Sequence, residues 1–241
     1  MEATAEGAPY EALVFDLDGT LVDTLPDMLA ALNGALAEYG QPRMAAAQVQ
    51  SRLHHGLEGM VDAALERDDG AQRGSGMRGG VLARFETSYA LTLVERSRPY
   101  PGVASALEKL ATRGTRMAVC TNKPQALAER LLAQLGLLEF FGTVVGADTC
   151  KERKPSAVPL LHAIKLIGTT PEKTLMIGDS AIDVACANAA SVRCWIYTRG
   201  YGGIDAVMQG IDSIFDDYAA LLGAAGVASA PDGMRATASR R

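Results

Sequence analysis

Short apolar runs rich in β-branched residues alternate along this chain with longer stretches of helical periodicity. Five of these runs are candidate strands: Ala12–Asp16, Arg116–Thr121, Thr143–Gly146, Thr174–Gly178 and Val192–Tyr197. Strands separated by helices pair most readily in parallel, with the helices covering both faces of the sheet. The pattern therefore predicts an α/β fold built on a parallel sheet.

One interval, residues 25–94, breaks this alternation. It offers no good strand, only helical periodicity in Met28–Tyr39, Leu57–Arg67 and Val81–Leu93. That is too much helix for one crossover connection, so we expect an inserted helical domain. Inside it, Asp68–Gly80 contains five glycines and almost no apolar residue, which predicts a flexible loop.

The remaining sequence is assigned to the core and to a tail. The core is expected to comprise residues 1–24 and 95–222, with the insert at 25–94. Two prolines and a glycine in Arg98–Gly102 make that segment a suitable re-entry point to the core. Residues 223–241 are rich in Ala, Gly and Ser and are predicted to form a flexible tail.

Composition excludes several classes of protein. The net charge is −5 and no dense Lys/Arg block occurs, which argues against nucleic acid or anionic lipid as a partner. No stretch offers about 18 uninterrupted apolar residues for a membrane span. Residues 1–9 hold two glutamates and no Lys or Arg, a pattern unlike a secretory signal. The four cysteines are dispersed, as expected for buried thiols in a reducing compartment. We expect a cytoplasmic protein, either monomer or homodimer.

The first candidate strand ends in a pair of acids. Asp16 and Asp18 stand two residues apart and are followed by Gly19, which permits a sharp turn, and Thr20, which adds a hydroxyl. Ligands of parallel α/β sheets collect beyond the carboxyl ends of the strands. One acid could attack phosphorus while the other exchanges a proton, provided that a cation relieves their repulsion. Alternatively, the segment is only a turn.

Polar residues also follow the other strands. Thr121 and Asn122 end the second strand, and Asp179 and Asp183 lie where the fourth strand gives way to a helix. Lys154 stands before another helix and offers a compact positive charge. Each feature alone is more often a helix cap or a solvated surface residue. Together they supply hard oxygen ligands from separate strand ends, as a Mg²⁺ site requires.

These residues carry a family resemblance. The order of Asp16–Thr20 (DxDGT), Thr121, Lys154 and Gly178-Asp179 with Asp183 resembles the four motifs of the haloacid dehalogenase superfamily of phosphotransferases. The helical insert resembles the C1 cap of that superfamily, and the core would then be its Rossmann-like sheet. More narrowly, DLDGTLVDT and the later Gly200-Tyr201-Gly202 are similar to bacterial phosphoglycolate phosphatases.

The resemblance implies a role for each residue of the motifs. Asp16 would be the nucleophile and a Mg²⁺ ligand, and Asp18 the general acid and base that also lends its main-chain carbonyl to the metal. Thr121 and Lys154 would hold phosphoryl oxygens, with Thr20 and Asn122 nearby. Asp179 would complete the Mg²⁺ site. Asp183 would either ligate the ion or orient a ligand. The reaction would be hydrolysis of a small phosphate ester through an aspartyl phosphate, with 2-phosphoglycolate as the expected substrate.

The cap loop departs from the phosphoglycolate phosphatase pattern. A Trp-Ile/Val-Gly-Asn-Gly loop is usual there, whereas this chain has Leu53–Gly59, with sequence LHHGLEG. We expect Arg52 to bind a substrate carboxylate, and Arg43 is a further candidate. His54 and His55 could contact the substrate, but because they lack metal-ligand partners we expect ordinary, partly exposed histidines.

Other functions fit the residues less well. Asp18 argues against a dehalogenase, which needs no second acid, and residues 25–93 contain no lysine for the Schiff base of a phosphonatase. A β-phosphoglucomutase-like isomerase stays open because its core chemistry is the same. A non-catalytic binding protein also stays open, although it would not require both Asp16 and Asp18.

Overall fold

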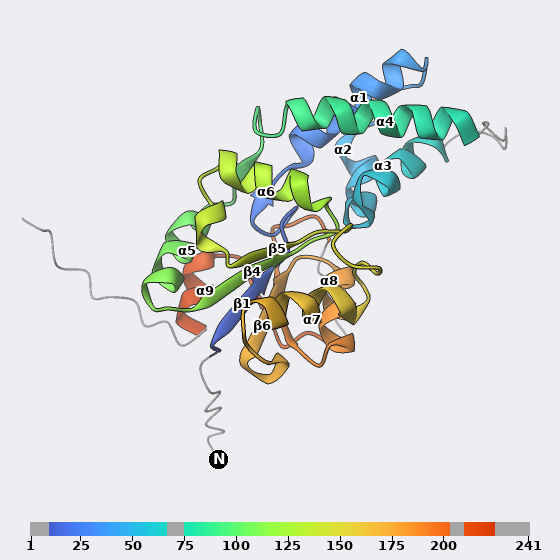
Figure 1. Cartoon of the computed structure of the whole chain (residues 1–241). Helices are drawn as coiled ribbons and strands as arrows, with labels where there is room; N and C mark the ends of the chain where they lie inside the picture. Colours follow the sequence, from blue (N-terminus) through green and yellow to red (C-terminus); the bar gives the residue numbers. More distant parts are fainter. Residues whose placement is uncertain (1–9, 67–74, 203–209, 225–241) are drawn as a thin grey trace, which may run out of the picture.

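The computed structural model describes residues 10–66, 75–202 and 210–224, and its centre is a six-stranded parallel sheet (Figure 1). The strand order is β5-β4-β1-β6-β7-β8. The strands are β1 (Ala12–Phe15), β4 (Arg116–Cys120), β5 (Thr143–Val145), β6 (Thr174–Gly178), β7 (Arg193–Tyr197) and β8 (Ser213–Phe215). The five strands expected from sequence are confirmed to within one residue at each end. The edge strand β8 was not expected.

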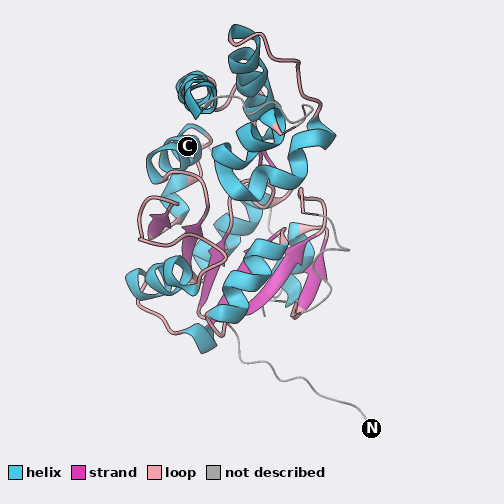
Figure 2. Ribbon diagram, turned by 90° about the vertical axis from the view of Figure 1, so that its right-hand side faces the viewer, coloured by secondary structure: helices cyan, strands magenta, loops and turns pink. Residues whose placement is uncertain are grey.

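Helices cover both faces of the sheet, as Figure 2 shows. One face carries α5 (Val103–Thr112), α6 (Gln125–Gln134) and α9 (Tyr218–Ala224), and the other carries α7 (Ala157–Leu166) and α8 (Ala181–Ala189). Short 3₁₀ turns occupy Leu138–Phe140 and Pro171–Lys173. Side chains alternate across a strand, so Leu13 and Phe15 of β1 pack into one core while Val14 packs into the other. The predicted α/β class is confirmed.

A helical unit stands over one end of the sheet (Figure 1). It comprises α1 (Leu25–Glu38), α2 (Ala46–Val49), the 3₁₀ turn η1 (Gln50–His55), α3 (Gly56–Leu65) and α4 (Ser75–Leu91). The chain leaves the core through β2 (Val22–Asp23) and returns through β3 (Arg98–Pro99), which pair antiparallel. We call this unit the cap. Its helices α1 and α4 pack along each other and share buried apolar side chains with the core.

The two chain crossings are tied together by buried hydrogen bonds. Asp27, which is 1% exposed, accepts from Arg96 N at 2.9 Å and from Ser97 N and Oγ at 2.7 and 2.8 Å. On the core side, Tyr201 donates its hydroxyl to Asp23 at 2.5 Å. The hinge between cap and core is therefore a hydrogen-bonded element rather than a loose linker.

The flexible loop expected over Asp68–Gly80 is wrong in its second half, because α4 begins at Ser75. Glycines disfavour helix by about 1 kcal/mol each, but packing overrides this propensity here. Arg78 forms a bidentate ion pair with Asp62 of α3, and Gly80 passes so close to the Tyr39 ring that a Cβ would overlap with it. Residues 68–74 lie outside the described part of the chain.

Three further expectations have structural outcomes. Gly223 and Ala224 of the predicted tail belong to α9, and the rest of the tail lies outside the described residues. Each cysteine is a free thiol; Cys120, Cys186 and Cys194 are buried, whereas Cys150 is only half-buried. Among residues 10–66, 75–202 and 210–224, every helix is too short or too polar to cross a membrane.

Candidate active site

Three neighbouring strands deliver the acidic and polar residues to one place. In the parallel register, Phe15 of β1 lies beside Val119 of β4 and Ile177 of β6. The residues that follow therefore emerge together at the carboxyl edge: Asp16, Thr121 and Asp179 are all buried there. The adjacency of these motifs, expected from sequence, follows from strand order alone.

A cavity opens at this edge, between core and cap. Its core wall includes Asp16, Asp18, Thr121, Asn122, Lys123, Lys154 and Ser180. Its cap wall is formed by Leu53 and His54 of η1 and by Gly56 at the start of α3. A ligand bound at the acids would thus contact both units, with apolar and polar surface around it.

Three carboxylates form a candidate metal centre. Asp16, Asp179 and Asp183 each offer an oxygen, and these oxygens lie within 4.8 Å of one another. Thr20 Oγ1 donates to Asp179 at 3.0 Å, and Ser180 Oγ donates to Asp183 at 2.6 Å, so both acids are oriented. Converging buried carboxylate oxygens are a donor set that a hard dication such as Mg²⁺ accepts.

Lys154 is the buried cation of this cluster. Its Nζ lies 2.7 Å from Asp16 Oδ1 and 2.6 Å from Asp183 Oδ1. Burial would raise the pKa of Asp183, but Lys154 and the Ser180 hydroxyl outweigh it and hold that pKa below its ordinary value. Burial raises the pKa of Asp16 to about 7, and burial together with Asp183 raises that of Asp179 well above its ordinary range. The single positive charge of Lys154 therefore does not balance the negative charge of three buried carboxylates.

Asp18 is held by a different set of donors. Thr24 Oγ1 donates to its Oδ1 at 2.6 Å, and Lys123 Nζ donates to Oδ1 and Oδ2 at 2.8 and 3.1 Å. The same Nζ lies 4.6 Å from the ring centroid of Tyr89, on α4 of the cap. Burial alone would lower the pKa of Lys123, but Asp18 outweighs it and raises that pKa above its ordinary value. The second acid of the motif is thus linked to the cap through one buried ammonium.

Thr121 and Asn122 differ in which of their side-chain hydrogen-bonding atoms are available to a ligand. Thr121 Oγ1 accepts from Lys123 N at 3.2 Å, so its own hydroxyl hydrogen is available to a ligand oxygen. Asn122 Nδ2 donates to the main-chain carbonyls of His54 and Lys154, at 2.9 and 3.0 Å. Both of its amide hydrogens are therefore used to join the cap loop to the core, and its Oδ1 has no partner among the described residues.

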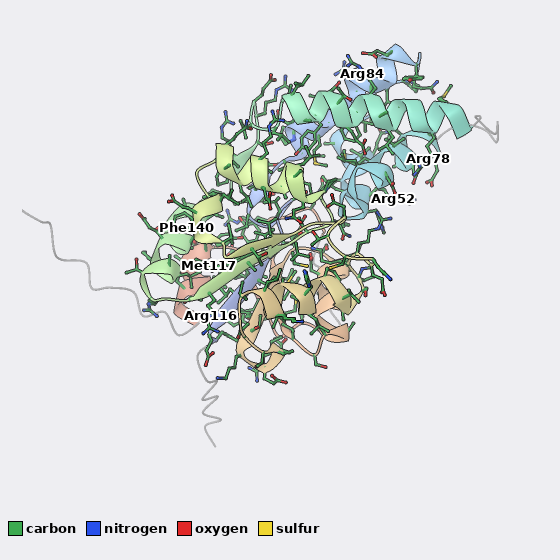
Figure 3. The ribbon with its side chains drawn as sticks, in the orientation of Figure 1. Arg52, Arg78, Arg84, Arg116, Met117 and Phe140 are labelled. Carbon is green, nitrogen blue, oxygen red and sulfur yellow. The ribbon has the colours of Figure 1, made fainter. Side chains whose placement is uncertain are left out.

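The structure does not bring Arg52 to the cavity. Its guanidinium pairs with Glu66 at 3.2 Å, and its side chain is 46% exposed at the outer surface of the cap (Figure 3). In the η1 turn, the Leu53 side chain is buried in the hydrophobic interior, and the neighbouring Arg52 side chain is therefore directed outward. Arg43 is exposed as well.

The two histidines of the loop differ. His55 is exposed, whereas His54 is half-buried in the cavity wall and burial lowers its pKa.

Four participants were given no role in the sequence analysis: Lys123 and Tyr89, and also Thr24 and Tyr201, which entered only as members of quoted motifs. The position of Lys123 directly after Thr121-Asn122, at the end of a buried strand, was a usable signal. Tyr89 offered none, because its contact with Lys123 depends on how the cap docks. Tyr201 N donates to Asp179 at 2.7 Å, which explains the glycines around it: a Cβ at Gly200 would overlap with Asp179.

Comparison with known proteins agrees with this geometry. Residues 13–196 match the family model described as haloacid dehalogenase-like hydrolase. The chain is 36% identical over 211 residues to a phosphoglycolate phosphatase of Chromobacterium violaceum, covering 88% of this chain and 94% of that one. It is 38% identical over 217 residues to a phosphoglycolate phosphatase of Rhodospirillum rubrum, covering 88% and 89%.

Solved structures give the same fold. A crystal structure described as a predicted phosphoglycolate phosphatase, from Haemophilus somnus, superposes with a TM-score of 0.83 at 30% identity and covers 89% of this chain and 97% of its own. CbbY from Rhodobacter sphaeroides, solved with phosphate, has a TM-score of 0.76 at 23% identity, with 88% and 96% covered, which speaks to the fold alone. The buried acids at the carboxyl edge of the sheet and these similarities place the chain in the haloacid dehalogenase-like hydrolase family.

Proposed function

We propose that the protein hydrolyses a small phosphate monoester, with Asp16 as the nucleophile, and that its substrate is 2-phosphoglycolate. The observation that carries the proposal is the position of Asp16, which lines the cavity, contacts Lys154 at 2.7 Å and clusters with Asp179 and Asp183. The substrate is inferred from the relatives, which are phosphoglycolate phosphatases.

Binding would orient the phosphoryl group over Asp16. Lys154, which contacts Asp16, and the Thr121 hydroxyl both line the cavity, and these two donors suit two phosphoryl oxygens. An in-line attack by an Asp16 oxygen on phosphorus would then release the alcohol and leave a phosphoaspartate. Phosphoryl transfer needs positioning and charge neutralisation more than covalent help, which matches this set of groups.

Asp18 is the candidate proton carrier. It would protonate the leaving oxygen and then take a proton from the water that hydrolyses the phosphoaspartate. Its hydrogen bond from Thr24 and its ion pair with Lys123 fix its position before substrate arrives. Thr20 and Asn122 would support these steps by position, because Thr20 orients Asp179 and Asn122 joins the two walls of the cavity.

We propose Mg²⁺ as the cofactor. Asp16, Asp179 and Asp183 would hold it together with the main-chain carbonyl of Asp18, and the buried, under-compensated carboxylates fit a dication. When bound, the ion supplies positive charge beside the transferred phosphoryl oxygens.

The division into cap and core gives specificity a location. We propose that residues 25–94 act as a lid on the core of residues 1–24 and 95–222, so that the cap wall of the cavity meets the leaving group. A reducing cytoplasm would suit the free thiols. For Arg52 to contribute, its side chain would have to leave Glu66 and turn inward.

A β-phosphoglucomutase-like isomerase is the competing function, because it would use the same core. The test is to incubate the protein with Mg²⁺ and either 2-phosphoglycolate or a hexose phosphate, and to measure both free phosphate and sugar phosphate products. Phosphate release that Asp16→Asn abolishes supports the hydrolase. Isomerised sugar phosphate without phosphate release would replace it with the isomerase.

A further inference from the structure

We propose that Lys123 recognises the carboxylate of the substrate and thereby makes the enzyme selective for phosphate esters of small hydroxy acids. The inference deepens the proposed phosphatase function and rests on it. It assigns to a core lysine the selection that sequence reasoning gave to the cap arginine Arg52.

The cavity offers few cations for such a carboxylate. Among the described residues lining it, the lysines are Lys123 and Lys154 and there is no arginine. Lys154 is engaged by Asp16 and Asp183, on the side where the phosphoryl group would bind. The arginines next to this region, Arg52 and Arg153, are about half exposed, line the neighbouring outer hollow and pair with glutamates of α3 and its C-terminus.

Lys123 is placed beside the leaving group rather than the phosphoryl group. Its Nζ bonds both oxygens of Asp18, the acid that must reach the leaving oxygen. In a 2-phospho hydroxy acid, a single carbon separates that ester oxygen from the carboxylate. A substrate that presents its ester oxygen to Asp18 therefore presents its carboxylate close to Lys123.

An exchange of partners follows from burial. The Lys123 side chain is 1% exposed, so an unpaired ammonium there would be costly. When Asp18 turns towards the leaving oxygen, its hold on Lys123 weakens, and the substrate carboxylate can take its place. A substrate with a neutral leaving group offers no such replacement. The enzyme thus distinguishes phosphate esters of hydroxy acids from those of neutral alcohols by whether the buried Lys123 ammonium stays paired.

The cap contributes the other side of this pocket. Tyr89 of α4 places its ring 4.6 Å from Lys123 Nζ, a cation–π contact that restricts where the ammonium can move. The ring and Asp18 together hold Lys123 in the cavity wall, where it meets a ligand that touches both cap and core.

The experiment compares two substrates that differ only at the carboxylate: 2-phosphoglycolate and 2-hydroxyethyl phosphate. Lys123→Met should lower kcat/KM for 2-phosphoglycolate about ten- to a hundredfold more than for 2-hydroxyethyl phosphate. Lys123→Arg, which keeps the charge, should retain part of the preference. The matched control is Lys109→Met, which removes an exposed lysine of α5 far from the cavity and should preserve the substrate ratio.

A second readout does not depend on turnover. In the Asp16→Asn background, calorimetry should show that Lys123→Met weakens binding of 2-phosphoglycolate much more than binding of 2-hydroxyethyl phosphate. Equal losses for both substrates would overturn the inference and leave Lys123 as a positioning residue for Asp18. If Lys123→Met does not fold, the wild-type protein still decides, because similar kcat/KM values for the two substrates would overturn it. Absence of Mg²⁺-dependent hydrolysis of either ester by wild type would instead reject the proposed function.

Discussion

Replacing Lys154 with methionine tests how the acidic cluster is stabilised. The residue is 4% exposed and its Nζ is the buried positive charge that touches both Asp16 and Asp183. Methionine fills a similar volume but leaves Asp16, Asp179 and Asp183 facing one another without that charge. The perturbation therefore isolates electrostatics from packing.

The expected loss is large. Removing one partner of a buried ion pair costs about 3–5 kcal/mol. In a domain of this size each kcal/mol moves Tm by about 2–4 °C, so metal-free Lys154→Met should melt roughly 6–20 °C below wild type. Lys173→Met is the matched control: Lys173 contacts Glu11 at 2.6 Å, but its side chain is 56% exposed. Its loss should stay at about 0–1 kcal/mol.

The loss should depend on pH with a defined sign. Lys154 lowers the pKa of Asp183 and opposes the rise of that of Asp16, so without it both carboxyls bind protons more tightly in the folded state. A folded state with raised carboxyl pKa values keeps its stability at low pH and loses it as pH rises through those values. The deficit should therefore be smaller at about pH 5 than at about pH 8.

The assay is thermal unfolding of both variants and wild type in EDTA and in Mg²⁺, at both pH values. Mg²⁺ should restore more stability to Lys154→Met than to wild type, because the variant lacks the competing cation. A deficit below about 1 kcal/mol, or one that is the same at both pH values, would refute the electrostatic reasoning.

Two further predictions concern the metal centre and the hinge. Chelation should abolish turnover and Mg²⁺ should restore it. Mg²⁺ should also raise Tm more at about pH 8 than at about pH 6. Burial raises the pKa of Asp16 to about 7, so below that pH a proton increasingly occupies the carboxylate and competes with the ion. Full activity in excess EDTA, or a pH-independent Tm gain, would contradict this. Asp27→Asn should cost about 1–3 kcal/mol in urea unfolding. Ser97 N, Ser97 Oγ and Arg96 N all donate to Oδ2 and Arg96 N also reaches Oδ1, so the amide would offer them one neutral acceptor oxygen and would place its own NH₂ donor beside a backbone N–H. Unchanged stability would show that the hinge does not depend on these bonds.

Most of the fold could be predicted from sequence because local signals agreed with the tertiary packing. The central strands are buried on both faces, so each appears as a continuous apolar run. The edge strand β8 could not be found, because only Phe215 among its three residues is buried. The start of α4 was missed because its local sequence, rich in glycine, disfavours helix. Its first turns are helical through contacts with Asp62 and Tyr39, which lie far away in sequence.

The residues of the candidate site likewise fall into those that the sequence predicts and those that only the tertiary structure reveals. Acids at strand ends could be found, since strand order alone brings Asp16 and Asp179 together. The expectation for Arg52 depended on the direction of one side chain in a short turn, and sequence does not determine that direction. The link from Asp18 through Lys123 to Tyr89 joins three distant segments, so only the docked cap reveals it.

The central claim, that Asp16 becomes phosphorylated during turnover, can be measured directly. The protein is mixed with Mg²⁺ and excess 2-phosphoglycolate, quenched in acid during turnover, digested at low pH and analysed by mass spectrometry. The account predicts phosphate on the peptide containing Asp16, loss of the modification as turnover ends, and none in Asp16→Asn. Release of phosphate without any phosphopeptide, or phosphate attached to another residue, would contradict it.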